Sequence, residues 1–226
     1  MPEGLAPREP DLRGVVFDLD GVVADSEPLH VRAWVQVLTA LGVDPAQVEP
    51  EILAAWVGVP DVNMVGGVVE RWKLTIAPAE LLAAKREAYR ELIPGSLASF
   101  PGVPEELASW DGTPLGMATA TARREAALML ATLGLERVFR VLVTGDEVRH
   151  PKPAPDCYLL AAERLRLDPR DCVAVEDAPH GVQAARAAGM YVLGVTTSFP
   201  AERLGQAHRL FSAVPEAIRW LKARVA

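Results

Sequence analysis

The stretch Val-Val-Phe-Asp-Leu-Asp-Gly, residues 15–21, decides the fold. Its first three residues are apolar and β-branched or aromatic, a composition typical of a buried strand. Asp18 and Asp20 follow, and because alternate residues of an extended chain point to the same side, both carboxylates can address one ligand. Gly21 then lets the backbone turn. Two carboxylates at the end of a buried strand are costly unless a cation or a substrate uses them, although Asp and Gly are also common in ordinary turns.

Further apolar runs alternate with helical patterns along the chain. Buried strands are predicted at residues 115–118, 141–143, 173–175 and 192–195, and helices at residues 123–134, 155–166, 180–188 and 215–224. Gly134 and Gly189 lie where helices would end, and Pro155 lies where one would begin. This alternation predicts an α/β fold with a doubly wound (Rossmann-like) parallel sheet as its core, which binds ligands beyond the carboxyl ends of its strands.

The segment between the first two strands is different, because residues 26–97 show only helical periodicity. Amphipathic helices are predicted at residues 29–41, 50–57, 61–73 and 78–92. A plain crossover between strands is much shorter. We therefore expect an inserted all-helical cap domain at residues 27–96, with a core domain made of residues 1–26 and 97–226.

Composition narrows the possible partners. The 226 residues carry a formal net charge of −7, which disfavours nucleic acids and anionic membranes as partners. Cys157 and Cys172 show no ligand spacing and indicate reduced thiols. We expect no signal peptide, and no apolar run approaches the roughly 20 residues that a membrane helix needs. We expect a cytoplasmic protein that is a monomer or a weak homo-oligomer.

Three further signals point to one kind of chemistry. Glu176 and Asp177 form a second acidic pair after a strand; if it meets the first pair, a hard dication such as Mg2+ relieves the repulsion. Lys152, held between prolines, can neutralise charge on a transferring phosphoryl group. Thr119 and Thr121 offer hydroxyl and N–H groups to phosphate oxygens. Each signal alone also fits an ordinary feature: a solvated loop, a surface lysine or a strand-end threonine.

Taken together in chain order, these residues carry a resemblance to a known family. They are Asp18 with Asp20, Thr119, Lys152, and Glu176 with Asp177. The order resembles that of the haloacid dehalogenase superfamily, and residues 17–27 (FDLDGVVADSE), 152–156 (KPAPD) and 176–182 (EDAPHGV) match its motifs. The resemblance covers nearly the whole chain. It is closest to the branch with a helical cap after the first strand, which includes sugar phosphatases and β-phosphoglucomutase.

The resemblance implies an Mg2+-dependent phosphatase that acts on a small phosphorylated metabolite, in particular a sugar phosphate. Asp18 is the implied nucleophile, which forms an aspartyl-phosphate. Asp20 protonates the leaving alkoxide and then activates water. Thr119 and Lys152 hold the phosphoryl group.

The resemblance also implies the binding residues. The metal ligands are Asp18, Asp20 through its backbone carbonyl, Asp177, and Glu176 as either a direct ligand or a close neighbour of the ligands. Phosphate and substrate contacts are implied for Gly21, Ala120, Thr121 and His30. His30 shares a helix face with Trp34; His30 is either a substrate contact or a satisfied polar neighbour, and we expect Trp34 to belong to the core.

The sequence departs from the family pattern at two positions in the later motifs. Pro151 precedes Lys152 where a small residue is usual, which would re-aim the lysine. Ala178 follows Asp177 where Ser is usual, so we expect one supporting hydrogen bond to be missing.

Two alternative functions remain open. A mutase of the β-phosphoglucomutase type must hold a second phosphate with cap cations, but residues 57–63 contain no Lys or Arg, and Ala122 stands at a lysine position of that enzyme. A non-enzymatic phosphoacceptor domain would use a similar Asp, hydroxyl and Lys, but it has no need of a cap or of Asp20.

Overall fold

The structure, a computed structural model, describes residues 13–55 and 61–224. The chain divides into two compact units, with the boundaries between Asp25 and Ser26 and between Ala98 and Ser99. The core unit contains the main sheet, and the helical unit comprises Ser26–Ala98. Each unit is described by itself.

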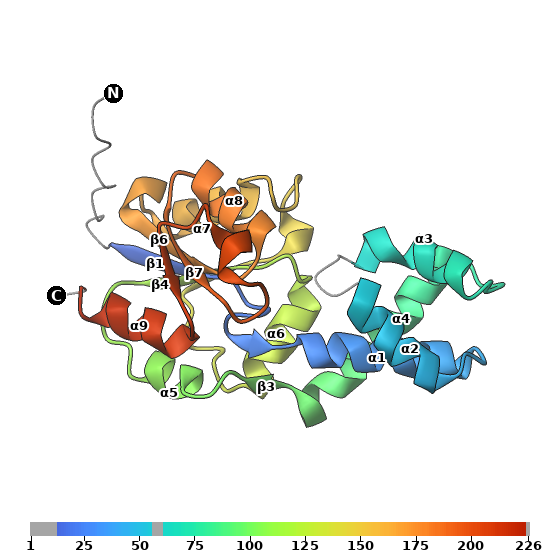
Figure 1. Cartoon of the computed structure of the whole chain (residues 1–226). Helices are drawn as coiled ribbons and strands as arrows, with labels where there is room; N and C mark the ends of the chain where they lie inside the picture. The colour runs from blue at the N-terminus through green and yellow to red at the C-terminus, as the bar shows by residue number, and fades with distance from the viewer. Residues whose placement is uncertain (1–12, 56–60, 225–226) are drawn as a thin grey trace. The chain divides into compact units, whose positions relative to one another are not determined.

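Within the described residues, the sheet of the core unit has six strands, all parallel (Figure 1). In spatial order they are β5 (Val141–Val143), β4 (Leu115–Ala118), β1 (Gly14–Phe17), β6 (Cys172–Glu176), β7 (Tyr191–Val195) and β8 (Arg209–Phe211). After β1, the chain adds β4 and β5 on one side of it and then returns to add β6, β7 and β8 on the other side. This is the strand order of a Rossmann-like sheet. The predicted fold class is confirmed. β8 was missed because it is a short and largely exposed edge strand.

The sheet register brings the ends of three strands to one edge. Phe17 pairs with Val175 of β6 and with Met117 of β4. The ladder continues one residue further, because the Asp18 N–H donates to the Val175 carbonyl at 3.0 Å and the Thr119 N–H donates to the Val143 carbonyl at 3.0 Å. The reversal of strand order lies between β1 and β6, so the residues that follow these two strands stand where a doubly wound sheet binds its ligand.

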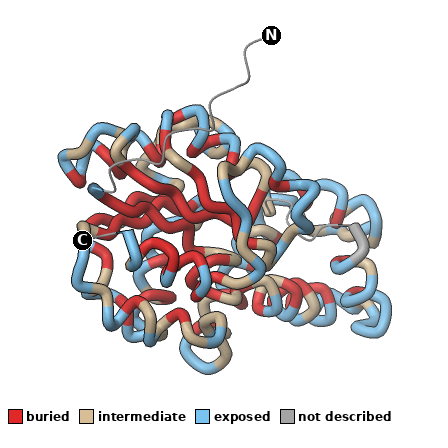
Figure 2. The backbone as a smooth tube through the Cα atoms, turned by 60° about the vertical axis from the view of Figure 1, so that its left-hand side comes forward, coloured by how far each residue is buried: buried red, intermediate tan, exposed pale blue. Residues whose placement is uncertain are grey.

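Helices cover both faces of the sheet. α7 (Asp156–Leu165) and α8 (Pro179–Ala187) lie on one side, and α5 (Val103–Ala108) and α9 (Val214–Lys222) lie on the other (Figure 1). Beneath α7 and α8, side chains of alternate strand positions such as Val16, Ala174 and Val192 form a buried cluster with the helix residues. Figure 2 shows that buried residues concentrate in the sheet. The burial of strands on both faces explains their continuous apolar runs.

The predicted helices of the core unit agree closely with the structure. α6 (Arg123–Thr132) and α8 are followed by Gly134 and Gly189, whose φ angles of 69° and 87° are left-handed, as expected at helix ends. α7 begins at Asp156, so Pro155 caps the helix rather than opening it. α5 was not predicted, because its six residues are too few to show a period.

The described part of the helical unit contains four helices. They are α1 (Glu27–Ala40), α2 (Pro45–Ala55), α3 (Asp61–Arg71) and α4 (Pro78–Ser96). The prediction of a helix at residues 50–57 was wrong at its start, because Pro50 lies inside α2. The helix begins earlier because the Asp44 carboxylate accepts the Ala46 N–H at 3.0 Å and Pro45 suits a first helical position. Residues 57–60, used above against a mutase, lie outside the described residues.

Two short strands mark the ends of the insertion. β2 (Ala24–Asp25) and β3 (Ala98–Ser99) form a second sheet, and the Ser99 hydroxyl donates to the Val23 carbonyl at 2.6 Å. Among the helices of residues 13–55 and 61–224, none is both long and apolar enough to cross a membrane.

Candidate functional site

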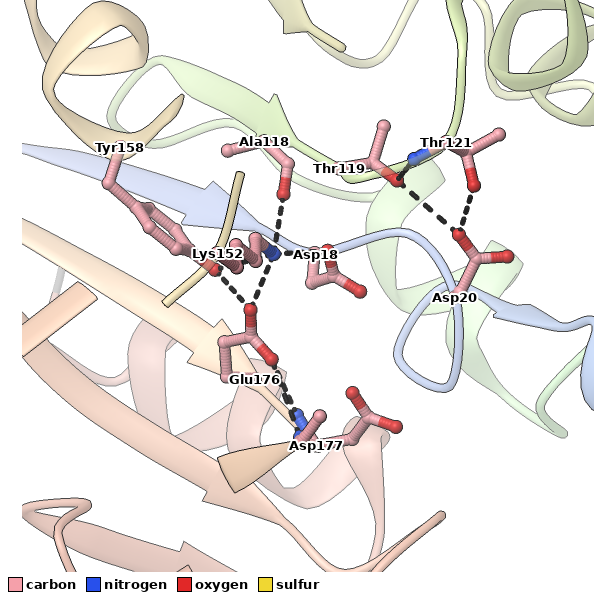
Figure 3. A network of polar contacts seen from close by, with 10 residues as sticks. Asp18, Asp20, Ala118, Thr119, Thr121, Lys152, Tyr158, Glu176 and Asp177 are labelled. Carbon is pink, nitrogen blue, oxygen red and sulfur yellow. Dashed lines mark hydrogen bonds and ion pairs between the residues drawn. The ribbon is translucent and has the colours of Figure 1, made fainter. Parts of the chain in front are cut away.

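The candidate site lies at the carboxyl edge of the sheet, within the core unit (Figure 3). Asp18 directly follows β1, Thr119 directly follows β4, and Glu176 ends β6 with Asp177 after it. Lys152 comes from the loop between the short helix η1 (Gly145–Glu147) and α7. Residues far apart in the sequence therefore meet because parallel strands end at the same edge.

Lys152 is the positive centre of this site, and its side chain is only 4% exposed. Its ammonium donates to Asp18 Oδ1 and to Glu176 Oε1, each at 2.6 Å, and to the Ala118 carbonyl at 3.0 Å. These three acceptors match the three protons of an ammonium group. Burial alone would lower the pKa of Lys152, but the charges of Asp18 and Glu176 raise it, so the lysine stays protonated. The expected re-aiming by Pro151 does not carry Lys152 away from Asp18.

Three buried carboxylates converge beside this lysine. Asp18, Glu176 and Asp177 are 7%, 1% and 4% exposed, and each offers an oxygen within 4.8 Å of the others. Burial raises the pKa of Asp18 well above its usual range, against the opposing effect of Lys152. Burial, followed by the charge of Glu176, raises the pKa of Asp177 to about 7. The cluster thus holds more negative charge than one lysine balances.

This cluster fits a hard divalent cation. If all three carboxylates are ionised, their charge of −3 and the +1 of Lys152 leave −2, which one dication neutralises. The donors are oxygens, the ligands that Mg2+ prefers. The raised pKa values of Asp18 and Asp177 express the same deficit of positive charge, because each carboxylate would otherwise bind a proton.

Glu176 is already saturated with hydrogen bonds from the protein. Its Oε1 accepts from Lys152 and, at 2.6 Å, from the Tyr158 hydroxyl. Its Oε2 accepts the backbone N–H groups of Asp177 and Ala178 at 3.2 and 3.4 Å. Gly181, in the first turn of α8, makes room for this arrangement, because a Cβ there would collide with the Glu176 carboxylate.

Asp20 stands apart from the carboxylate cluster. Its Oδ2 accepts the Thr121 hydroxyl at 2.7 Å and the Thr119 hydroxyl at 3.3 Å. The Thr119 oxygen in turn accepts the Thr121 N–H at 3.0 Å. The two hydroxyls predicted to bind phosphate therefore hold the Asp20 carboxylate in this structure, next to exposed Ala120.

The loop after β7 contacts Asp177 and the turn at Gly21. Gly21 has a φ of +75°, and a Cβ there would run into the carboxylate of Asp177 and the hydroxyl of Ser198, so the turn requires glycine. Ser198 hydrogen-bonds the Asp177 side chain, and the Thr197 hydroxyl donates to the Gly21 carbonyl at 2.5 Å. Ser198 thus supports Asp177 beside Ala178, which has no hydroxyl to offer.

His30 belongs to a separate cluster inside the helical unit. Its ring stacks on Tyr89 with centroids 4.1 Å apart, and its Nδ1 lies 2.5 Å from Lys85 Nζ. Lys85 is 1% exposed and pairs with Asp61 at 2.5 Å. Trp34, which is 1% exposed and donates to Asp61 at 3.2 Å, belongs to the core as expected. Lys85 is the only Lys or Arg that is buried among the described residues of this unit.

Sequence reasoning missed three residues at these sites. Tyr158 lies six positions after Lys152, and a buried tyrosine usually needs a partner for its hydroxyl, which was a usable signal. Ser198 follows the end of β7, the same edge where the acidic pairs gather. Lys85 gave no signal, because lysine on an amphipathic helix is usually solvated.

Comparisons with known proteins agree with this geometry. Residues 12–189 match the model of the haloacid dehalogenase-like hydrolase family. The fructose-1-phosphate phosphatase YqaB of Escherichia coli (strain K12) is 38% identical over 80% of this chain and 95% of its own length. A phosphorylated carbohydrates phosphatase of Thermotoga maritima is 33% identical over 79% of this chain and 82% of its own length.

A solved structure resembles most of the chain. The crystal structure of a putative β-phosphoglucomutase from Thermotoga maritima is 32% identical with a TM-score of 0.77, and the similarity covers 93% of this chain and 99% of that chain.

Proposed function

Because this chain belongs to the haloacid dehalogenase-like hydrolase family and is a phosphoric monoester hydrolase, we propose that it is a sugar-phosphate phosphatase that works through a phosphorylated Asp18 and uses Mg2+. The observation that carries the proposal is the pairing of Asp18 with Lys152 at 2.6 Å inside a buried group of carboxylates. A lone catalytic carboxylate would repel a phosphate dianion; this one stands beside a cation.

In the first half-reaction, a carboxylate oxygen of Asp18 attacks phosphorus. The new oxygen–phosphorus bond forms as the bond from phosphorus to the sugar oxygen breaks, which divides a difficult displacement into two easier ones. Lys152 neutralises charge on the carboxylate and on the phosphoryl group. Asp20 gives its proton to the leaving sugar oxygen.

In the second half-reaction, Asp20 takes a proton from water and the water oxygen attacks phosphorus. Inorganic phosphate leaves and Asp18 is restored as a carboxylate. In this structure Asp20 Oδ2 accepts from the Thr119 and Thr121 hydroxyls, and we infer that Asp20 leaves them when it turns toward the substrate. Those hydroxyls then become available to phosphate oxygens, the role predicted for Thr119 and Thr121.

Mg2+ would be held by the carboxylates of Asp18 and Asp177 and by the backbone carbonyl of Asp20. Bound there, it supplies positive charge that offsets the phosphoryl oxygens and the attacking carboxylate. Glu176 is better suited to a supporting role, since protein donors already occupy both of its oxygens. The Glu176 carboxylate balances the charge of Lys152, and the carboxylates that would bind Mg2+ directly are those of Asp18 and Asp177.

The proposed substrate class rests on the relatives. Two are named for phosphatase activity on fructose 1-phosphate and on phosphorylated carbohydrates. The roles of Gly21 and Ala120 in phosphate binding, of His30 in substrate binding, and of residues 27–96 as a cap remain predictions.

The test is phosphate release from a panel of substrates: fructose 1-phosphate, β-glucose 1-phosphate, phosphoglycolate and a nucleoside monophosphate. We expect the fastest release from a sugar phosphate, with Mg2+ required and EDTA inhibiting. Asp18→Asn is the matched control for contaminating phosphatases. Release that is fastest from phosphoglycolate or the nucleotide would overturn the substrate class, and full activity in EDTA would overturn the use of Mg2+.

A second candidate function is a β-phosphoglucomutase-type isomerisation. It is favoured by the solved relative described above and by Lys85, a buried cation. A mutase needs spare positive charge for a second phosphate, whereas Lys85 is already offset by Asp61. Incubation with β-glucose 1-phosphate and a trace of the 1,6-bisphosphate separates the two: we expect inorganic phosphate, and efficient formation of glucose 6-phosphate would reinstate the mutase.

A further inference from the structure

A buried phenol lies behind the Lys152–Glu176 pair. Tyr158, on the first turn of α7, is 0% exposed. Its hydroxyl lies 2.6 Å from Glu176 Oε1 and 3.3 Å from Lys152 Nζ, and the lysine ammonium lies 4.9 Å from the centre of its ring. Figure 3 shows Tyr158 beside Lys152 and Glu176. No step of the proposed mechanism uses this residue.

The direction of the hydrogen bonds follows from counting protons. The phenol has one proton, and the short contact to the Glu176 carboxylate takes it, because a carboxylate only accepts. Lys152 already directs its three protons to Asp18, Glu176 and Ala118 at 2.6–3.0 Å. The contact from Lys152 to the phenol at 3.3 Å is therefore the weaker one, and Tyr158 acts mainly on Glu176.

The hydrogen bond from Tyr158 keeps Glu176 from drawing Lys152 away from Asp18. The lysine lies at the same distance, 2.6 Å, from its acceptors on Asp18 and on Glu176. Without the phenol, Oε1 of the buried Glu176 would keep Lys152 as its only donor among the residues that the structure describes. Its attraction for the ammonium would rise, because a buried carboxylate that lacks a hydrogen bond is costly. The lysine would then shift away from Asp18.

We propose that Tyr158 is a positioning residue, whose hydroxyl holds the Glu176 carboxylate so that Lys152 stays shared with the nucleophile and Glu176 stays off the metal site. The effect reaches the reaction through Glu176 and Lys152, and the phenol itself touches neither substrate nor cation. This inference rests on the proposed function, because it assigns Asp18 as the nucleophile.

The variant that tests it is Tyr158→Phe, which keeps the ring and removes one oxygen. We expect kcat to fall about tenfold, as for loss of a hydrogen bond to a charged group, while KM changes less than twofold. Tyr191→Phe, the same change on β7, is the matched control and should leave both parameters unchanged. An unchanged kcat in Tyr158→Phe would overturn the proposal, as would a variant that no longer folds, since the hydroxyl would then be structural.

A double-mutant cycle with Glu176→Gln separates positioning from packing. In the Glu176→Gln background we expect Tyr158→Phe to lower kcat less than twofold, because the charge it acts on is gone. Equal fold-changes in both backgrounds would overturn the proposal.

The same cycle can be measured without turnover, by calorimetric titration with Mg2+ alone. We expect Tyr158→Phe to change the Mg2+ Kd at least threefold in the wild-type background and less than twofold in the Glu176→Gln background; equal changes would contradict the proposal. The two proposals fail separately. Absence of phosphate release by the wild-type protein sinks the function, whereas equal effects of Tyr158→Phe in the two Mg2+ titrations sink only the role of Tyr158.

Discussion

Replacing Asp177 by Asn should stabilise the metal-free protein and at the same time remove its response to Mg2+. Asp177 is 4% exposed, and burial together with the charge of Glu176 raises its pKa to about 7. At pH 8 the folded protein therefore carries an ionised carboxylate in a place that favours the neutral form. Asn has the same shape without the charge, and its side-chain oxygen can still accept from Ser198.

The size of the effect follows from the pKa shift. A rise from 3.8 to about 7 corresponds to about 4 kcal/mol at 1.36 kcal/mol per unit, which is an upper bound. Relaxation and entry of water reduce such penalties, so we expect a gain of about 2 kcal/mol in the free energy of unfolding at pH 8. The folded state binds more protons than the unfolded state between these two pKa values. Metal-free wild-type protein therefore loses stability as pH rises from about 4 to about 7, and the Asn variant lacks this slope.

The assay is urea denaturation at pH 8, first in EDTA and then with saturating Mg2+. Wild-type protein should gain stability from the cation by mass action, and Asp177→Asn should gain little. Asp111→Asn, the same change at an exposed position, is the control. The reasoning is refuted if Asp177→Asn is less stable than wild type in EDTA, or if Mg2+ stabilises both proteins equally.

Four further predictions follow from the site and its surroundings. Asp18→Asn should lower kcat by about a thousandfold or more with an unchanged circular dichroism spectrum, because it removes the nucleophile; residual activity within tenfold of wild type would contradict the assignment. The apparent Mg2+ affinity, measured by calorimetry, should fall at least about tenfold per pH unit below pH 7, because Asp177 must lose a proton to bind and Asp18, whose pKa is also raised, must be ionised as well; a flat profile would exclude Asp177 as a ligand. Gly181→Ala should lower the free energy of unfolding by about 1–3 kcal/mol in urea denaturation and should lower kcat, because the new methyl displaces the Glu176 carboxylate. An unchanged free energy of unfolding and an unchanged kcat would contradict this. Burial would raise the pKa of Glu147, but hydrogen bonds from Arg164, Thr144 and Arg123 lower it to about 2. Its contribution to stability is therefore complete above pH 4.5 and is lost as pH falls through about 2. Glu147→Gln should cost about 1 kcal/mol at pH 7 and about a quarter of that at pH 2.5, and an equal cost at both pH values would contradict this.

The fold could be predicted because its strands are short apolar runs with polar residues at one end. The segment from Val15 to Asp20 specifies both a buried strand and the place where chemistry occurs, and Glu176 with Asp177 repeats the pattern. β8 and α5 could not be predicted, since three and six residues are too few to show a period. The start of α2 was misplaced, because the predicted segment began at Pro50, which lies inside the helix.

The contacts that tune the site were harder to predict. Which oxygen of Glu176 faces Tyr158 depends on how α7 packs over the sheet, which no local pattern describes. The support of Asp177 by Ser198 likewise joins two strand ends whose order in the sheet has to be known first. The burial of Lys85 could not be predicted either, because it depends on Asp61 from another helix.

The central claim, that Asp18 is phosphorylated during turnover, is tested most directly by trapping the intermediate. The protein is mixed with fructose 1-phosphate and Mg2+, quenched in acid within one turnover and reduced with borohydride, which converts an aspartyl-phosphate to homoserine. Peptide mass mapping should then find homoserine at position 18 in wild-type protein and none when substrate is omitted. Turnover that proceeds with no modification at position 18, or with the modification at another carboxylate, would contradict the account.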